Sequence, residues 1–223
     1  NERYLPLYEA KMIHHYNHRW ASSTADDERE MDAEFYANPN NVVMPRYWVG
    51  AEEVEQQLKG KWDRKWLMGF RNITNTTNER TIISSVFPLC AVGHSMPLIL
   101  SDKLLISGII LNSNLISFVQ DYIARQKVGG TNLTFGYFNQ FPILSPEKYK
   151  KNKLSPILIP EKSFKSNDND KQIDTLLHNW LLLRVLELTY TAYDLKPFAL
   201  DCGYSGPPFK WDEDRRFMIC CEL

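Results

Sequence analysis

The chain has 223 residues, of which 43% are hydrophobic and 24% are charged, so it is long enough to bury a core without disulfides or metal ions. Its 26 Lys and Arg residues nearly balance its 27 Asp and Glu residues, and the net charge of -1 excludes a uniformly basic, histone-like DNA binder. A nucleic-acid binder whose basic residues gather on one face is still compatible with this balance.

Targeting signals are missing from the sequence. No run of 18 apolar residues is present, which excludes a transmembrane helix, and Asn1–Tyr8 lacks the basic region and apolar core of a signal peptide. The four cysteines have no CxxC spacing, which favours reduced thiols in a cytoplasmic protein over a zinc site. Because there is no initiator Met and the end is abrupt, we expect the chain to be a piece of a longer protein.

In chain order, hydrophobic periodicity and turn residues predict alternating helices and strands over the first two thirds of the sequence. The expected elements are a short helix over Ala51–Lys59, strands over Trp66–Arg71 and Thr81–Phe87 with a polar turn at Asn72–Asn78, a strand over Cys90–Leu100 interrupted by Gly93 and Pro97, a helix over Leu104–Ala124 with Leu105, Ile109, Leu115, Phe118, Val119 and Tyr122 near one face, and a short strand over Thr131–Phe135.

The last third of the sequence differs in amino-acid composition. Pro146–Asp170 is rich in Lys, Ser, Asn and Pro, which is typical of a linker or surface loop, and helices are predicted over Asp174–Tyr193 and Asp212–Cys221. We therefore divide the chain into a core at 1–145, a Lys-rich linker at 146–172 and a helical segment at 173–223. The predicted fold is α/β (α+β): a twisted mixed or antiparallel sheet flanked by helices, with a helical C-terminal tail.

A histidine cluster is the first candidate for chemistry. His14 and His18 would share one face of a helix, with His15 beside them. A metal site would need a third ligand and usually a carboxylate that hydrogen-bonds to a ligating histidine. Serine hydrolase, kinase, cofactor-binding and nuclease motifs are all missing, so we assign no catalytic and no metal-binding residues. A stand-alone enzyme built on this cluster is kept as an alternative.

Three segments carry side chains suited to DNA. Arg offers a fork to guanine or phosphate, Asn can pair with adenine, and Thr hydroxyls suit phosphates, although a capped hairpin and a simple helix stop explain the same residues structurally. Trp62 and Trp66 beside the lysines also allow a protein-interaction module. The candidate DNA contacts are Arg71, Thr74, Asn75, Thr77, Asn78 and Arg80; Arg125, Lys127, Gly129, Gly130, Thr131 and Asn132; Lys61, Arg64 and Lys65; and Lys11 and Arg19 near the N-terminus.

Several blocks, in this order, resemble the C-terminal region of large bacterial restriction-modification proteins that fuse an adenine-N6 DNA methyltransferase to a specificity domain, the type IIG enzymes and their phage-defence relatives. The resemblance spans nearly the whole chain. The blocks are Pro6–His14 with His18-Arg19, Gly69–Thr74 with Asn78–Thr81, Asn112-Ser113, Asp121-Tyr122, Ala124–Thr131, Phe141–Ile143, Leu186–Leu195, Pro207–Phe209 and Trp211–Arg216. The stretch from Gly129 to Ile143 is also similar to target recognition domains of type I specificity subunits.

The resemblance implies a target recognition domain that binds duplex DNA sequence-specifically and presents an adenine to a methyltransferase domain of the same polypeptide. The methyltransferase motifs are outside this chain, so no cofactor is expected here, whereas the parent would use S-adenosylmethionine and, if it also cleaves DNA, magnesium. Partners implied by the resemblance are double-stranded DNA and the intramolecular methyltransferase domain, with no membrane.

Overall fold

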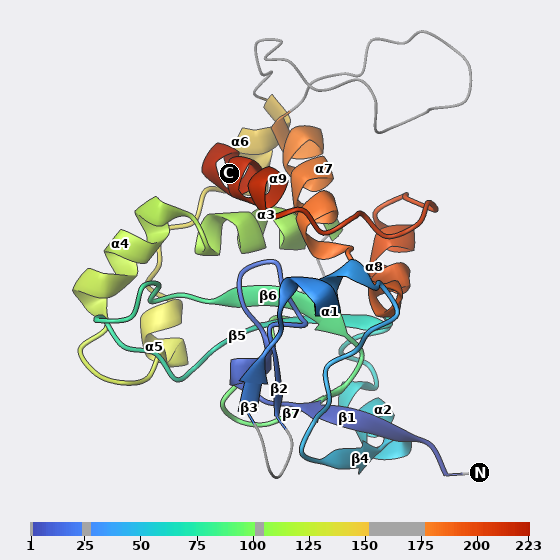
Figure 1. Ribbon diagram of the computed structural model, residues 1–223. Coiled ribbons are helices and arrows are strands. Elements are labelled where there is room, and N and C mark those ends of the chain that lie inside the picture. The colour runs from blue at the N-terminus through green and yellow to red at the C-terminus, as the bar shows by residue number, and fades with distance from the viewer. Residues whose placement is uncertain (1, 24–27, 101–104, 152–176) are drawn as a thin grey trace, which may run out of the picture.

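The computed structural model describes residues 2–23, 28–100, 105–151 and 177–223, and every structural statement below concerns these residues. They form small sheets surrounded by helices (Figure 1). The predicted α/β class is confirmed, but the strands are divided among three small mixed or antiparallel sheets in place of one larger twisted sheet. No helix in the described ranges is long and apolar enough to cross a membrane.

A buried two-stranded ribbon lies at the centre. β5 (Trp66–Phe70) pairs antiparallel with β6 (Ser84–Pro88), which confirms both predicted strands with slightly different ends. Because successive side chains of a strand point to opposite faces, Met68 and Phe70 pack in one hydrophobic cluster and Leu67 packs in another. The ribbon therefore separates two cores, and its uninterrupted apolar run reflects burial on both faces.

The stretch that follows β6 returns along the free edge of β5. β7 (Ala91–Val92) covers only the beginning of the strand predicted over Cys90–Leu100, and the later part pairs with β5 through Phe70 N–H to the Pro97 carbonyl (3.1 Å). Gly69 makes this approach feasible, since a Cβ there would come within 2.6 Å of the Pro97 oxygen.

The N-terminal strand organises a second sheet. β1 (Tyr4–Tyr8) pairs antiparallel with β4 (Trp48–Gly50) and parallel with β7. The predicted helix near Ala51 is confirmed as α2 (Ala51–Leu58), which buries Val54 and Leu58 against this sheet. Smaller elements complete the N-terminal region: η1 (Ala10–Met12), the pair β2 (Ala21–Ser23) and β3 (Glu28–Glu30), and α1 (Ala33–Ala37).

Helices gather on the other side of the β5–β6 ribbon (Figure 1). They are α3 (Leu105–Leu115), α6 (Pro146–Lys151), α7 (Leu177–Thr189), η2 (Tyr193–Leu195), α8 (Lys196–Asp201) and α9 (Glu213–Glu222). Val185, Leu188 and Ile219 are fully buried in the same cluster as Met68, so the helical C-terminal segment packs on the core. The start predicted for the last helix is confirmed, because the Asp212 carboxylate accepts the Arg215 N–H at 2.9 Å.

The single helix predicted over Leu104–Ala124 is wrong in one respect: it is broken in two. Ser117 leaves helical geometry and its hydroxyl accepts the Gln120 N–H at 3.2 Å, which begins a second helix, α4 (Phe118–Lys127). The change of axis turns Phe118, Val119 and Tyr122 outward, with exposures of 66–72%, away from the buried face expected for them.

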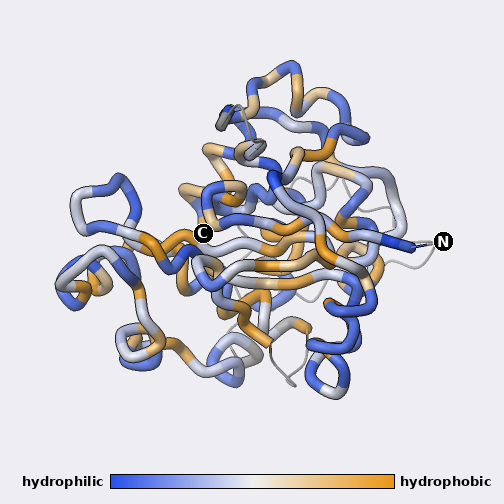
Figure 2. Tube along the Cα trace, turned by 90° about the horizontal axis from the view of Figure 1, so that it is seen from below, coloured by the Kyte–Doolittle hydropathy of each residue, from blue (hydrophilic) through white to orange (hydrophobic). Residues whose placement is uncertain are grey.

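The remaining predictions are met in part. In place of the strand predicted over Thr131–Phe135, the structure has one isolated bridge at Asn132, and Phe135–Phe138 forms a short helix, α5. Of the linker predicted at 146–172, the described part is α6, whose buried Tyr149 donates to the Asn114 side-chain oxygen at 2.9 Å; the rest lies outside the described residues, as does the predicted start of the helix at Asp174. Figure 2 shows the apolar segments concentrated in the strands of the interior and the polar segments in peripheral loops.

Candidate nucleic-acid interface

The structure joins two polar segments that are far apart in the sequence. The Asn/Thr loop (Asn72–Thr81) and the glycine loop (Val128–Thr134) pair through Leu133 N–H to the Asn72 carbonyl (2.7 Å) and Thr74 N–H to the Thr131 carbonyl (3.0 Å). An isolated bridge between Ile73 and Asn132 lies between these two bonds. Two of the candidate DNA-binding segments therefore form one continuous surface.

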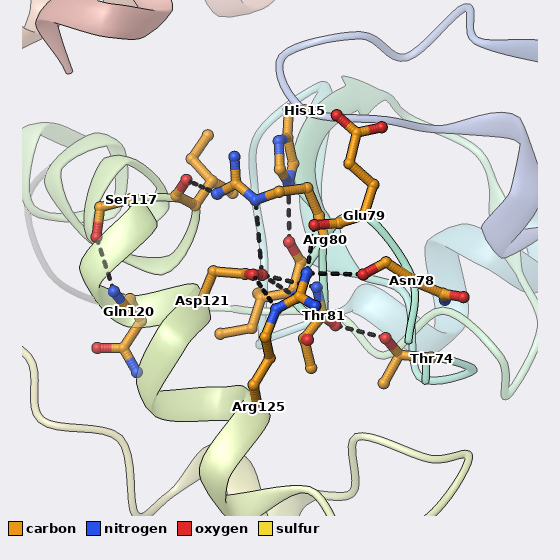
Figure 3. Close-up of polar contacts among 12 residues, drawn as sticks. His15, Thr74, Asn78, Glu79, Arg80, Thr81, Ser117, Gln120, Asp121 and Arg125 are labelled. Carbon is orange, nitrogen blue, oxygen red and sulfur yellow. Dashed lines mark hydrogen bonds and ion pairs between the residues drawn. The ribbon is translucent and has the colours of Figure 1, made fainter. Parts of the chain in front are cut away.

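A buried carboxylate braces this surface from beneath (Figure 3). Asp121, on α4 and only 4% exposed, accepts the backbone N–H groups of Thr81 (2.7 Å) and Ile82 (3.0 Å). The same carboxylate forms ion pairs with Arg125 (3.0 Å) and Arg80 (3.6 Å). Asp121 thus fixes the end of the Asn/Thr loop to α4 and is the shared counter-ion of two guanidinium groups.

The guanidinium of Arg125 donates hydrogen bonds to the backbone of the Asn/Thr loop. The acceptors are the carbonyls of Thr76 (2.8 Å), Asn78 (2.7 Å) and Glu79. Figure 3 shows the bonds from Arg125 to Asn78 and Glu79 converging from α4 on the Asn/Thr loop. The fork expected to read a base therefore holds the shape of the loop instead.

Arg80 is engaged in the same way. Its guanidinium donates to the Ile116 carbonyl and lies over the Phe118 ring, 4.7 Å from the centroid. Thr74 is buried, and its hydroxyl donates to the Thr81 carbonyl at 2.6 Å. Both residues support the loop from within.

Two further arginines also bind backbone carbonyls. Arg71 donates to those of Ile13 (2.9 Å) and Lys11 (3.3 Å), and burial lowers its pKa to about 10. Arg19, expected as a phosphate contact, is fully buried and its guanidinium is directed into the protein. We therefore leave Arg19 out of the candidate surface.

The exposed members of the surface are mostly amides, hydroxyls and glycines. Asn75 forms a turn, its side-chain oxygen accepting the Thr77 N–H at 3.0 Å, whereas the Asn78 side chain makes no hydrogen bond with a described residue. Ile73 is 62% exposed among them and was not predicted as a site residue, although it is an apolar residue within a polar run of the sequence. The exposed candidates are Asn75, Thr77, Asn78, Lys127, Gly129, Gly130, Thr131 and Asn132.

The basic segment Lys61–Lys65 lies elsewhere. It precedes β5 whereas the Asn/Thr loop follows it, so the two are at opposite ends of a five-residue strand, about 17 Å apart. Lys61 and Lys65 are exposed, but Arg64 pairs with Asp201 at 2.8 Å. Near the N-terminus, half-buried Lys11 has the Glu9 carboxylate at 3.9 Å.

The tryptophans of that segment are largely internal. Trp66 is 3% exposed and donates to Asp201 at 2.8 Å, and the half-buried Trp62 packs against it edge to face. Arg64 covers both rings, at 5.9 and 5.6 Å from their centroids. The pair therefore offers little open aromatic surface to a partner protein.

The three histidines of the N-terminal cluster have three different environments. His14 packs against Trp20 with the rings tilted (4.5 Å between centroids), and His15 donates to the Ile82 carbonyl (2.8 Å). His18 is buried and bonds Asp194 at 2.8 Å. Within the part of the chain that the structure describes, no group of three or more His, Cys, Asp or Glu side chains is arranged to hold a metal ion.

Acidification is expected to destabilise the fold through His14 and His15. Burial and neighbouring cationic groups lower their pKa values from 6.5 to about 3 and about 4. Between these values and pH 6.5 the two rings are therefore protonated in the unfolded chain and neutral in the folded chain. Stability is therefore complete above about pH 6.5 and falls as the pH drops from there toward 4. We expect a loss on the order of 1–2 kcal/mol per ring at pH 5, measured by urea unfolding at pH 7 and pH 5.

The variant His15→Gln separates this effect from general acid sensitivity. Its amide can still donate to the Ile82 carbonyl but does not titrate, so the difference between pH 7 and pH 5 is expected to shrink. His94→Gln, at an exposed position, is the matched control. An undiminished pH dependence in His15→Gln would contradict the assignment.

The candidate interface is thus a paired-loop surface whose arginines bind backbone carbonyls of the protein and whose exposed residues are mainly amides, hydroxyls and glycines. Compared with protein-family models, curated proteins and solved structures, the chain finds no match.

Proposed function

We propose that this chain is the sequence-specific duplex DNA recognition domain of a bacterial restriction-modification or phage-defence protein. In this proposal it presents a target adenine to a methyltransferase domain of the same polypeptide, in the cytoplasm. The observation that carries the proposal is the joining of the Asn/Thr loop to the glycine loop on a rigid brace. The family resemblance of the sequence blocks supports it independently.

Base reading is assigned to the exposed amides. Asn78 has both its amide donor and its acceptor available, and a side-chain amide can pair bidentately with the major-groove edge of adenine. Asn75 keeps its NH2 group for the same purpose because only its oxygen is used in the turn. Since the loop backbone is held by Arg125, these amides are presented without a large loss of loop entropy on binding.

Phosphate contacts are assigned to the residues around the glycine loop. Lys127 is an exposed charge at the end of α4, and Thr77 and Thr131 are exposed residues of the two paired loops. Gly129 and Gly130 have no side chains to keep a polyanion away from the backbone. Such contacts fix the register of a duplex without carrying sequence information.

Lys11, Lys61 and Lys65 are assigned to more distant phosphates of the same duplex. Their charges carry no base pattern, and the length of β5 separates Lys61 and Lys65 from the base-reading amides. No catalytic step is assigned to this chain. Methyl transfer, with S-adenosylmethionine as donor, and any magnesium-dependent cleavage belong to the parent protein.

The division between reading and positioning predicts two kinds of mutant. Asn78→Ala is expected to cost about 1–3 kcal/mol on the preferred duplex and to relax selection at one position. Lys127→Ala is expected to weaken binding to every duplex alike and to reduce the salt slope by about one unit. The measurement is affinity over a panel of duplexes at two salt concentrations.

Asn40→Ala is the control, because Asn40 is an exposed amide outside the paired loops. If Asn78→Ala and Lys127→Ala cause the same uniform loss, the division of roles is wrong. If neither changes affinity for any duplex while Lys61→Ala does, the DNA surface lies at the other end of β5.

A further inference from the structure

A small cavity lies beside the braced loop, outside the surface assigned to duplex DNA. It encloses about 220 Å³ where the turn His14–Asn17, the junction of α3 with α4, and α9 meet. This is below the roughly 300–1,000 Å³ of sites that hold drug-sized ligands, so it suits a single planar ring system. Its lining includes the rings of Tyr16, Phe118 and Phe217.

Tyr16 is the most unusual residue of the lining. It is 2% exposed, yet its hydroxyl has no hydrogen-bond partner among the described residues. The Ser113 hydroxyl lies close by and donates to the Ile109 carbonyl at 3.1 Å, but the Ser113 and Tyr16 hydroxyls do not meet hydrogen-bond geometry. Tyr16 is also the one described non-glycine residue with positive φ, at 52°. A buried, unpaired hydroxyl held on a strained backbone is costly, and it points to a ligand that pairs with it.

Two more polar side chains belong to the lining, those of His15 and Arg80. His15 donates through Nε2 to a carbonyl, which can only accept, so its Nδ1 is left as an acceptor. Arg80 also lines the cavity: its buried Nε faces the Asp121 carboxylate at 3.6 Å, so the guanidinium contributes positive charge at this wall. Figure 3 shows His15 and Arg80 side by side above Asp121. The cavity thus offers a hydroxyl, a ring-nitrogen acceptor and the positive charge of Arg80.

The aromatic rings at the cavity are open to solvent. Phe118 and Phe217 are 70% and 71% exposed, although both line the same small space. The Arg80 guanidinium packs on Phe118 and fixes its position. Exposed aromatic rings next to mixed donors and acceptors match the stacking faces and polar edge of a nucleobase.

We propose that this cavity binds one unpaired nucleobase, stacked on Phe118 and Phe217, with its polar edge toward Tyr16, His15 and Arg80. The inference rests on the proposed DNA-binding function, since Arg80 belongs both to the Asn/Thr loop and to the cavity. A base that leaves the duplex beside this loop would be held here while the rest of the duplex stays on the paired loops.

The probe is 2-aminopurine riboside, a nucleoside whose fluorescence is quenched by stacking on aromatic rings. The chain is expected to quench it saturably. Phe118→Ala should weaken binding more than tenfold and Tyr16→Phe about five- to tenfold. Tyr122→Ala is the matched control, because Tyr122 is an exposed aromatic residue one turn further along α4 that does not line the cavity.

Thermal unfolding distinguishes a ligand contact from a structural role for the hydroxyl. Tyr16→Phe removes only a group without a partner, so its melting temperature should equal or exceed that of the unmodified chain while nucleoside binding falls. A lowered melting temperature with unchanged nucleoside binding would assign the hydroxyl to folding and overturn the proposal.

Duplex binding is measured in parallel so that the two proposals fail separately. Duplex binding without nucleoside quenching overturns the cavity proposal and leaves DNA recognition standing. Saturable quenching that Phe118→Ala abolishes, without duplex binding, supports the cavity and overturns its link to DNA recognition. Self-association that Phe217→Ala abolishes, with no quenching, would show that the rings serve an interface between copies of the chain, which also overturns the proposal.

Discussion

Replacing Asp121 by alanine is expected to lower the free energy of unfolding by about 3–5 kcal/mol, because it breaks a buried ionic network from its centre. The carboxylate accepts two backbone N–H groups and pairs with two arginines. Its removal leaves the N–H groups of Thr81 and Ile82 without an acceptor and the charges of Arg80 and Arg125 without a counter-ion in a largely buried setting. Each of these losses is costly in a low-dielectric interior.

Urea unfolding of Asp121→Ala, Asp121→Asn and Asp63→Ala provides the measurement. The asparagine variant keeps an acceptor but loses the charge, so we expect an intermediate loss. Asp63 is exposed, and its replacement is expected to change stability by no more than about 0.5 kcal/mol. A stability for Asp121→Ala within 1 kcal/mol of the unmodified chain would mean that the network does not brace the loop.

The same variant tests how the brace serves DNA binding. If the Asn/Thr loop is held open by Asp121 and Arg125, an unbraced loop must be ordered at the moment of binding. Affinity should then fall for every duplex, without the single-position loss of selectivity expected for Asn78→Ala. Reading and bracing therefore give different patterns over the same panel of duplexes.

Local patterns in the sequence were sufficient for the elements whose burial is simple. The apolar run of β5 and the caps of α9 are short-range signals, and both elements form where predicted. The break at Ser117 was not predicted, because Phe118, Val119 and Tyr122 continue the helical period of α3 and only tertiary packing decides that they face outward. Periodicity reports apolar spacing and cannot distinguish a core face from an exposed functional face.

The candidate site shows the same limit for charged residues. Composition marked the Asn/Thr and glycine loops as polar, and their pairing brings these two marked segments together. The inward direction of Arg71, Arg80 and Arg125 was not predicted, since a guanidinium can equally bind a phosphate or a backbone carbonyl. One local signal was available: Asp121 and Arg125 are four residues apart on a helix, a spacing that favours an ion pair.

The cavity lined by Tyr16, Phe118 and Phe217 could not be predicted from the sequence. Tyr16, Phe118 and Phe217 come from distant parts of the chain, and no spacing rule connects them. The unpaired Tyr16 hydroxyl is visible only when its surroundings are complete. Sites assembled from long-range contacts therefore need the structure, whereas loops with a polar composition can be nominated without it.

Arg19→Met is expected to destabilise the fold by about 3 kcal/mol and to leave the pattern of DNA selection unchanged. Arg19 is fully buried and donates to the carbonyls of Asn38 (3.2 Å), Asn41 (3.1 Å) and Thr191 (3.1 Å). Hydrogen bonds from a charged donor contribute about 1.5–3 kcal/mol each, and methionine recovers part of the loss by filling the apolar volume. Thermal and urea unfolding measure the effect.

The bond to Thr191 gives this residue a long-range role. Together with the His18–Asp194 pair at 2.8 Å, it ties the N-terminal region to the segment that follows α7. Limited proteolysis of Arg19→Met should therefore release the helical C-terminal segment sooner than in the unmodified chain. Arg29→Met, at a position 66% exposed, is the control and should behave like the unmodified chain. The opposite result, unchanged stability with uniformly weaker duplex binding, would restore Arg19 as a phosphate contact, and it would require the buried guanidinium to turn outward when DNA binds.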